Sequence, residues 1–228
     1  QPPNGQVRRQ APQFNKINDI PTLIQTAHSS LFAMSMSPSN TAAFWNSLAK
    51  QLGRNNQFNL TYEQMDSHIN QLFQHTRRTL GSFGMKDLTQ TTYSMAKLAD
   101  LLHKRHSNIN HRKDNIASSL SNLLLNDDAT INKDLFLSLA NECLRKLDQF
   151  DARHISNLAY AYALIQYVPV LIDGSNLFHQ FAKAAIQRKE DFISQDVANL
   201  LWSFATMGMI DKQLFSSFVP TAAKLIDN

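Results

Sequence analysis

Several features that mark other classes of protein are scarce or missing in this sequence of 228 residues. A single cysteine, Cys143, excludes an internal disulfide framework and fits a reducing compartment. No apolar run approaches the roughly 18 residues that a helix needs to cross a bilayer, so no membrane partner is expected. Only 6 glycines and 7 prolines occur, and no segment shows a convincing strand-like alternation of polar and apolar residues. These absences predict an all-α fold.

Motifs of catalysis are missing as well. The sequence has no Gly-rich phosphate loop, no nucleophile elbow and no paired-carboxylate signature. Cys143 aligns with alanines in the repeats described below, which predicts a small core position and not the exposed, electropositive site of a reactive thiolate. His103, His106 and His111 lie close together, but a fourth ligand and a fixed spacing are not evident. We therefore expect no enzyme, no catalytic residue, no metal site, no cofactor and no small-molecule substrate.

What the sequence does contain is internal repetition over residues 134–228. Three copies of one amphipathic segment, spaced by 42 and 37 residues, start at Leu135-Phe136, Leu177-Phe178 and Leu214-Phe215. Between them, residues 150–163 recur as residues 192–205. Self-similarity at a period of about 20–50 residues indicates a stacked array of repeats. Such arrays bind an extended partner along one long surface.

Helical periodicity of the apolar residues covers almost the whole chain. Helices are expected near 19–36, 41–53, from 61, 87–106, 116–124, 133–148, 151–166, 174–189, 194–208 and 212–227. Pro38 and Ser39 are expected to break the first helix and Gly53 to end the second. Thr61 and Gln64 are expected to form a capping box for the third.

Taken in pairs, the first helices of the repeats start near residues 41, 87, 133, 174 and 212. The predicted architecture is a right-handed α-solenoid of stacked helix–turn–helix repeats, with about nine to ten helices. One array is expected over 19–228, with degenerate repeats over 19–130 and clear repeats over 131–228. The second helix of each clear pair is apolar all round, which indicates burial on all sides. For this reason Trp45, Trp202 and Tyr160 are interpreted as core residues in preference to base-stacking platforms.

Positive charge is concentrated in two segments of the chain. The net charge is +4 overall, but +3 over 1–18 and +6 over 71–113, and the remainder is acidic. A basic region on an otherwise acidic chain is typical of a polyanion-binding surface, although a solvated basic helix face is the alternative. The predicted RNA-binding residues are Arg8, Arg9, Arg77, Arg78, Lys86, Lys97, Lys104, Arg105, Arg112 and Lys113. Either phosphate binding or the dipole at a helix C-terminus accounts for Arg145, Lys146, Arg153, Lys183, Arg188 and Lys189.

The first 18 residues are interpreted as a flexible basic arm that becomes ordered only on binding, since the segment is rich in proline and glutamine and lacks acids. Gln1 stands where a methionine would begin an unprocessed chain, which favours a processed chain or a fragment. Arginine without acids is also typical of an organelle transit segment or its remnant.

One string, residues 194–208 with the sequence SQDVANLLWSFATMG, resembles the second helix of the octotricopeptide and heptatricopeptide repeat families. Residues 154–163 are similar, with Tyr160 in the tryptophan position and Asn157 matching Asn199. The resemblance is specific over 134–228 and faint before it. It does not extend to the C-terminal RAP domain that accompanies related arrays. Repeat length varies and the tryptophan occurs in one copy, which favours a structural RNA clamp over base-by-base reading.

The resemblance implies an RNA-binding protein of an organelle, in the mitochondrial matrix or alternatively in a plastid. The leading hypothesis is a structural, rRNA-binding component of a divergent mitochondrial ribosome, a ribonucleoprotein of translation, in contact with ribosomal RNA and neighbouring proteins. One alternative is a protein–protein adaptor without direct RNA contact. Another is an organellar factor for RNA processing or stability.

Overall fold

The structure is a computed structural model that describes residues 12–55, 64–105, 116–126 and 130–226. Within these ranges it contains ten α-helices and no β-strand, apart from two isolated bridges. The prediction of an all-α fold with about nine to ten helices is therefore confirmed. No helix in the described part of the chain combines the length and the apolar character that crossing a membrane would require.

The α-helices follow one another with short connections, several of which contain a 3₁₀ turn. In chain order the α-helices are α1 (Ile20–Phe32), α2 (Pro38–Asn55), α3 (Met65–Thr79), α4 (Met85–Arg105), α5 (Ile116–Leu124), α6 (Lys133–Arg145), α7 (Ala152–Leu164), α8 (Leu177–Gln187), α9 (Ser194–Thr206) and α10 (Lys212–Ile226). The 3₁₀ turns are η1 (Phe14–Lys16), η2 (Leu80–Ser82), η4 (Leu147–Gln149) and η5 (Lys189–Asp191).

Five helices begin at an Asp or Asn whose side chain accepts a backbone hydrogen bond. In each case the side chain accepts from the N–H three residues later, at 2.7–3.1 Å, and the capping residues are Asp19, Asn132, Asp151, Asn176 and Asp211. This bond satisfies one of the four N–H groups that a helix leaves without a partner at its N-terminus. The starts of α1, α6, α7, α8 and α10 are therefore specified locally.

Replacing Asn176 by alanine is expected to lower the free energy of unfolding by about 1 kcal/mol, because the N–H of His179 loses its acceptor at 2.7 Å. Urea unfolding followed by circular dichroism measures this loss. Asn176→Ser keeps a capping oxygen and is expected to retain most of the stability. An equal loss in both variants would show that capping is not the cause.

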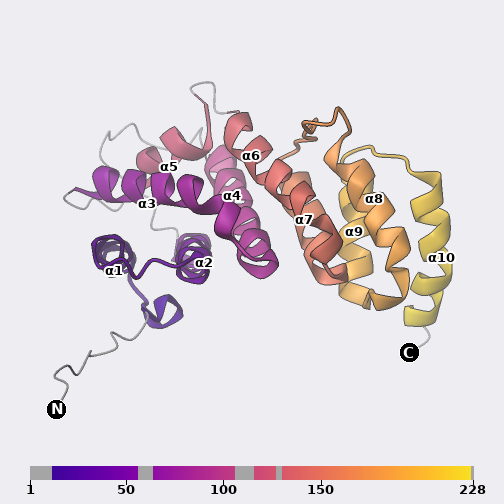
Figure 1. The fold of residues 1–228 in the computed structure, drawn as a ribbon, viewed down its shortest axis with the longest axis horizontal. Coiled ribbons are helices and arrows are strands. Elements are labelled where there is room, and N and C mark those ends of the chain that lie inside the picture. The colour runs from indigo at the N-terminus through magenta and orange to yellow at the C-terminus, as the bar shows by residue number, and fades with distance from the viewer. Residues whose placement is uncertain (1–11, 56–63, 106–115, 127–129, 227–228) are drawn as a thin grey trace, which may run out of the picture.

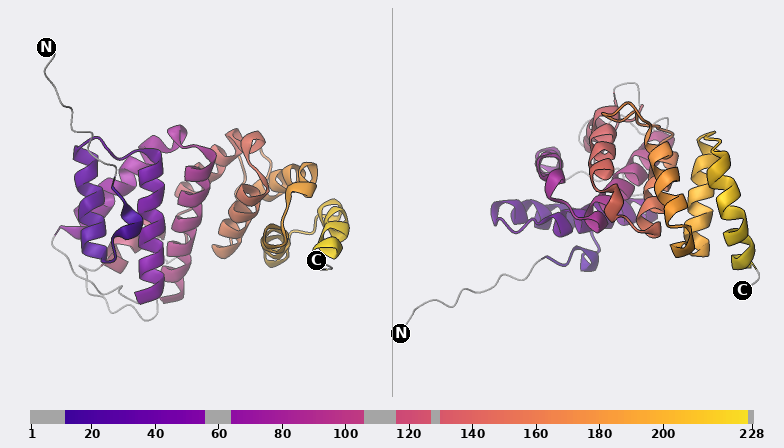
Figure 2. Two further views of the ribbon diagram at one scale, coloured as in Figure 1. Left: turned by 90° about the horizontal axis from the view of Figure 1, so that it is seen from below. Right: turned by 45° about the vertical axis from the view of Figure 1, so that its right-hand side comes forward.

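Contacts order the helices into two rows, one of which, α2, α4, α7 and α9, advances along the long axis of the molecule (Figure 1). In one row α2 packs on α4, α4 on α7 and α7 on α9. In the other row α1 packs on α3 and α3 on α5, and further along α6 packs on α8 and α8 on α10. The views in Figure 2 show the same progression, with the N- and C-terminal helices at opposite ends. Neighbours in each row are therefore separated in sequence by one helix of the other row, except α4 and α7, which are separated by α5 and α6.

The predicted pairing of the early helices is wrong. It treated the helices starting near 41 and 87 as the first members of their repeats, whereas α2 and α4 lie in the same row as the second helices α7 and α9. The helix α5 packs on both α3 and α4. It adds one helix to the chain between α4 and α6, so that the alternation of first and second helices changes at this point. The burial of α4 could not be recognised from its apolar pattern, because three of its buried side chains carry hydroxyl groups. Thr91, Thr92 and Ser94 are at most 1% exposed.

The start and end of α2 differ from the prediction. Pro38 is the first residue of α2, because proline suits the first position of a helix, where its missing N–H is not needed. Gly53 does not end the helix, which continues to Asn55. A Cβ at Gly53 would lie 3.8 Å from Leu101 of α4, so this glycine is part of the packing between two helices.

The capping box predicted for the third helix is not formed. Gln64 has a φ of 65° and immediately precedes α3, so it cannot be the third residue of a helix opened by Thr61. Thr61 itself lies outside the described residues.

Part of the predicted N-terminal arm packs against the helices. Phe14 is 1% exposed and makes an edge-to-face contact with Phe44, with ring centroids 6.1 Å apart. The Gln51 side chain donates to the carbonyl of Ile17 at 2.7 Å. The prediction of a flexible arm is therefore wrong for residues 12–18, and residues 1–11 lie outside the described part.

One hydrophobic core runs through both rows, from Phe14 to Phe218. Trp45 is fully buried, and its Nε1 donates to Thr76 Oγ1 at 2.9 Å. Cys143 is also fully buried, and this burial raises the pKa of its thiol well above the usual value. The thiol is thus protonated and inert at neutral pH, and the predicted core positions of Trp45 and Cys143 are confirmed.

Candidate nucleic-acid interface

An open groove with a volume of about 470 Å³ crosses α4, α7 and α9. These three helices are successive members of one row. Side chains from all three line the groove, and most of them are polar. Since the groove crosses the helices and does not follow any single one, it offers an extended ligand a similar set of contacts at each step.

Three positions recur on each of the three helices. From α4 to α7 to α9 they read Lys86, Arg153 and Gln195, then Gln90, Asn157 and Asn199, and then Tyr93, Tyr160 and Trp202. The first two positions line the groove on all three helices, whereas at the third position only Tyr93 lines it. Counterparts are 67 residues apart between α4 and α7 and 42 apart between α7 and α9. Within each helix the three positions are i, i+4 and i+7, which share one helix face. The repeated positions therefore place cations, amides and aromatic rings side by side on neighbouring helices, in an arrangement that we call the stripe.

The aromatic residues form a continuous row. The ring centroids of Tyr93 and Tyr160 are 6.1 Å apart and those of Tyr160 and Trp202 are 4.9 Å apart, each pair tilted by 35°. Trp202 is 45% exposed, and both tyrosines are half-buried. The interpretation of Trp202 as a core residue is therefore wrong. Trp45, in contrast, lies fully inside the core.

Burial, and to a smaller extent the neighbouring Tyr160, raises the pKa of the Tyr93 hydroxyl. Tyr93 is therefore neutral at physiological pH and keeps its hydroxyl proton as a donor. An aromatic row of this kind presents faces on which bases can stack whatever their sequence.

The amide position supplies donors and acceptors beside the rings. Asn199 Oδ1 accepts from Gln195 Nε2 at 3.1 Å, and Gln90 Nε2 makes a long contact of 3.4 Å with the carbonyl of Ala42. Asn157 lies between these two amides in the row. Carboxamides pair with base edges through both of their polar atoms, so this position is suited to hydrogen bonds with nucleobases.

Two cations occupy the first of the three recurring positions, on α4 and α7. Lys86 and Arg153 are exposed and line the groove. Neither forms an ion pair with a residue of the described ranges. Both are therefore available to neutralise phosphate groups.

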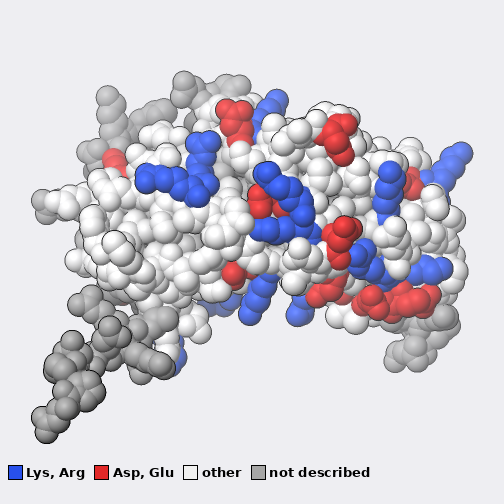
Figure 3. Space-filling view, viewed as in Figure 1, with Lys and Arg blue, Asp and Glu red and all other residues white. Residues whose placement is uncertain are grey.

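The other predicted RNA-binding residues are not gathered at this groove. Arg77 and Arg78 are exposed at the end of α3. Lys97 is half-buried further along α4, and Lys104 pairs with Asp100 at 2.8 Å. With a rise of 1.5 Å per residue, Lys86 and Lys104 are roughly 27 Å apart along α4. In Figure 3 the basic side chains on the visible face are spread over several helices, and toward α8–α10 acidic ones lie among them.

Arg78 contributes to a separate hollow of about 270 Å³ between α1 and α3. This hollow lacks an aromatic row, and its polar lining comes mainly from Asn70, Gln71, Gln74 and His75. It is a less complete site for bases than the groove on α4, α7 and α9.

The remaining sequence-based candidates are only partly covered by the structure. Arg105 is the last residue of α4. Arg8, Arg9, Arg112, Lys113, His106 and His111 lie outside the described residues. In the ranges that the structure covers, no group of three or more His, Cys, Asp or Glu side chains is placed to hold a metal ion.

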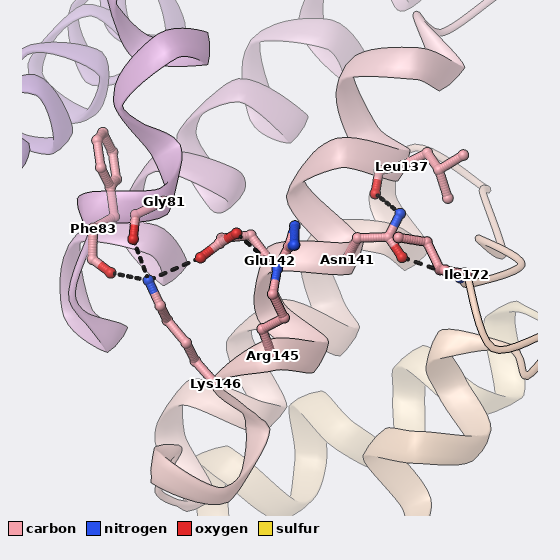
Figure 4. Close-up of polar contacts among 8 residues, drawn as sticks. All are labelled: Gly81, Phe83, Leu137, Asn141, Glu142, Arg145, Lys146 and Ile172. Atoms are coloured by element: carbon pink, nitrogen blue, oxygen red, sulfur yellow. Dashed lines mark hydrogen bonds and ion pairs between the residues drawn. The ribbon is translucent and has the colours of Figure 1, made fainter.

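Three cations, for which the sequence allowed either phosphate binding or a role at a helix end, have partners within the protein. Two of them, Arg145 and Lys146, are drawn in Figure 4. Lys146 Nζ donates to the carbonyls of Gly81 and Phe83 at 3.0 and 2.7 Å. It also pairs with Glu142 at 2.9 Å, and Arg145 pairs with the same carboxylate at 3.1 Å.

Arg188 donates to the carbonyls of Ala184 and Asp148 at 3.2 and 2.9 Å. Through these hydrogen bonds Lys146 and Arg188, at the ends of α6 and α8, contact neighbouring segments of the chain. Arg153 was grouped with these cations in the sequence, but it lies in the first turn of α7 and not at the end of a first helix.

Comparisons with known proteins add no functional assignment. No protein-family model matches the chain, and no curated protein matches it.

Proposed function

We propose that this chain is a non-catalytic RNA-binding protein that holds single-stranded RNA in the groove across α4, α7 and α9. The observation that carries the proposal is the row of Tyr93, Tyr160 and Trp202, which begins at the groove with Tyr93. Amides line the groove beside Tyr93, together with two cations that form no ion pair within the described residues. Stacking on such rings contributes about 1–3 kcal/mol per base. Lys86 and Arg153 add an electrostatic contribution that does not depend on base sequence.

The proposal extends to the architecture and the setting. The two rows of helices support a right-handed α-solenoid, and residues 194–208 support the octotricopeptide or heptatricopeptide type. On this basis the protein is an organellar one, and its RNA is ribosomal RNA of a divergent mitochondrial ribosome. Neighbouring proteins of that particle would cover other surfaces of the chain. An RNA-processing factor outside the ribosome is separated from this proposal by whether the protein sediments with organellar ribosomes.

Salt dependence tests the RNA-binding proposal. We expect the logarithm of the affinity for a single-stranded 12-mer to fall linearly with the logarithm of salt concentration. The slope should become shallower by about 0.7 for each neutralised phosphate that is lost. Lys86→Ala and Arg153→Ala should each remove about one such contact, as measured by fluorescence anisotropy over a salt titration.

Lys104→Ala is the matched control for those two variants. It removes one positive charge from the same helix as Lys86, but this lysine is paired with Asp100 and lies away from the groove. Its slope is expected to stay at that of the unmodified protein. Equal effects of all three variants would indicate general attraction by net charge, and no binding at low salt would contradict the proposal.

A protein–protein adaptor is the second candidate function, and one observation favours it. Ile193, Ile210 and Val219 are 56%, 86% and 65% exposed around α9 and α10. Large apolar side chains exposed along two successive helices are suited to contacts with another protein. If the adaptor function holds, Ile210→Asp and Val219→Asp should abolish co-sedimentation with organellar ribosomes, while Lys86→Ala and Arg153→Ala should leave it unchanged.

A further inference from the structure

The floor of the groove contains a buried carboxylate that phosphate binding does not explain. Asp196, the third residue of α9, lines the groove and is only 5% exposed. One of its oxygens, Oδ1, lies 3.2 Å from Ser156 Oγ of α7, a hydroxyl that donates either to Asp196 or to the carbonyl of Arg153 at 3.1 Å. No residue of the described ranges forms an ion pair with it. A buried carboxylate normally has several donors or a cation, so Asp196 has capacity for a further donor.

The negative charge of Asp196 decides which part of an RNA strand faces the floor. A phosphate placed there would meet a like charge in a partly dehydrated environment, which is unfavourable. Phosphates are instead attracted to Lys86 and Arg153, which are exposed. The bases therefore point toward the floor, and Asn199 lines the groove about one turn further along α9.

The four RNA bases differ in what they can offer a carboxylate. Guanine has two adjacent donors, N1–H and the N2 amino group, that match the two oxygens of a carboxylate in parallel. Cytosine and adenine each place one amino donor beside a ring nitrogen that is an acceptor. Uracil has a single N–H between two carbonyl oxygens, which a carboxylate repels. Charge-assisted pairs with two parallel bonds are the strong and selective ones.

We propose that Asp196 is a specificity residue that makes one position of the groove selective for guanine. This inference rests on the proposed function, because it presupposes single-stranded RNA in the groove. Asp196 Oδ2 and the remaining lone pair of Oδ1 accept from the guanine edge, while Ser156 holds the carboxylate in place. The flanking contacts to rings and phosphates remain independent of sequence.

Only α9 supplies such a carboxylate to the groove. The counterpart of Asp196 on α7 is His154, whose Nδ1 is 2.7 Å from Asp151 Oδ1. The counterpart on α4 is Asp87, whose two oxygens both accept from Ser39 Oγ, at 3.0 and 3.1 Å, and which does not line the groove. The selectivity therefore concerns one nucleotide and not a repeated code.

The test compares 12-mers of uridine that carry a single guanosine, inosine, adenosine or cytidine near the centre. Fluorescence anisotropy with the full chain at low salt gives the affinities. Guanosine is expected to tighten binding about tenfold over uridine, since a good bidentate pair discriminates by at least that order. Inosine keeps N1–H but lacks the N2 amino group, so its affinity should lie between those of guanosine and uridine.

Asp196→Asn is expected to reduce the guanosine preference to within about twofold. An amide keeps one acceptor for Ser156 but loses the charge and the second acceptor. Asp87→Asn is the matched control, because it removes the same charge at the same position on α4. It should raise the affinity for all oligonucleotides alike and leave their ratio unchanged. Thermal unfolding of both variants checks that the helices are retained.

The outcomes separate this inference from the proposed function. Binding of all five oligonucleotides with affinities within twofold would overturn the role of Asp196 while leaving RNA binding intact. A guanosine preference that survives Asp196→Asn would also overturn it, because another group would then read the base. Failure of every oligonucleotide to bind would overturn both proposals.

Discussion

Replacing Tyr160 and Trp202 together by leucine is expected to weaken binding of single-stranded RNA about thirtyfold or more. Each ring that stacks on a base contributes about 1–3 kcal/mol, so the loss of two rings removes at least about 2 kcal/mol. Leucine keeps an apolar, helix-forming side chain at both positions, so the row of helices should remain intact. Anisotropy with a uridine 12-mer at low salt measures the affinity.

The control for this pair is the double replacement by phenylalanine. Phenylalanine keeps an aromatic face at both positions and is expected to retain most of the affinity. Trp202 is 45% exposed, so little core packing is at stake there. If the leucine and phenylalanine variants bind RNA equally, the rings contribute no stacking and the proposed role of the row is wrong.

The second large effect concerns the stability of the fold. Lys146→Met is expected to lower the free energy of unfolding by about 2–3 kcal/mol, since the buried Glu142 carboxylate and the part-buried carbonyl of Phe83 both lose a charged partner. The ammonium group of Lys146 satisfies the carbonyls of Gly81 and Phe83 and pairs with Glu142 (Figure 4). Without it, the Glu142 side chain, which is 9% exposed, retains only Arg145 as an ion-pair partner. Urea unfolding measures the change.

Arg145→Met provides the comparison for Lys146→Met. It removes a positive charge from the same carboxylate, but the Arg145 side chain is 62% exposed. Exposed ion pairs contribute about 0–1 kcal/mol, so the loss of stability should be well below that of Lys146→Met. Equal losses in the two variants would show that the contacts of Lys146 with Gly81 and Phe83 do not contribute to the free energy of unfolding.

The fold of the C-terminal half could be predicted from its apolar pattern. The helices α6 to α10 are where the repeated segments predicted them, and their starts are marked by capping residues such as Asn132 and Asn176. The early pairing could not be predicted in the same way. α4 buries Thr91 and Thr92, and hydroxyl residues do not reveal burial in a hydrophobic pattern.

The groove was only partly visible in the sequence. The net charge of a segment led to Arg77, Arg78 and Lys104, but charge along a chain does not say which helix face a side chain occupies. A better signal was present in the match of Asn157 with Asn199 and of Tyr160 with Trp202. A polar and aromatic stripe that recurs at the repeat spacing marks a shared exposed face, whereas core positions recur as apolar residues.

Photochemical crosslinking of a 4-thiouridine-labelled 12-mer to the full chain tests most directly whether RNA lies in the groove on α4, α7 and α9. Peptide mass spectrometry then identifies the crosslinked residues. The proposal predicts crosslinks at Tyr93, Tyr160 and Trp202, which should disappear when unlabelled RNA competes. Crosslinks confined to the hollow beside Arg78, or none that competing RNA removes, would contradict it.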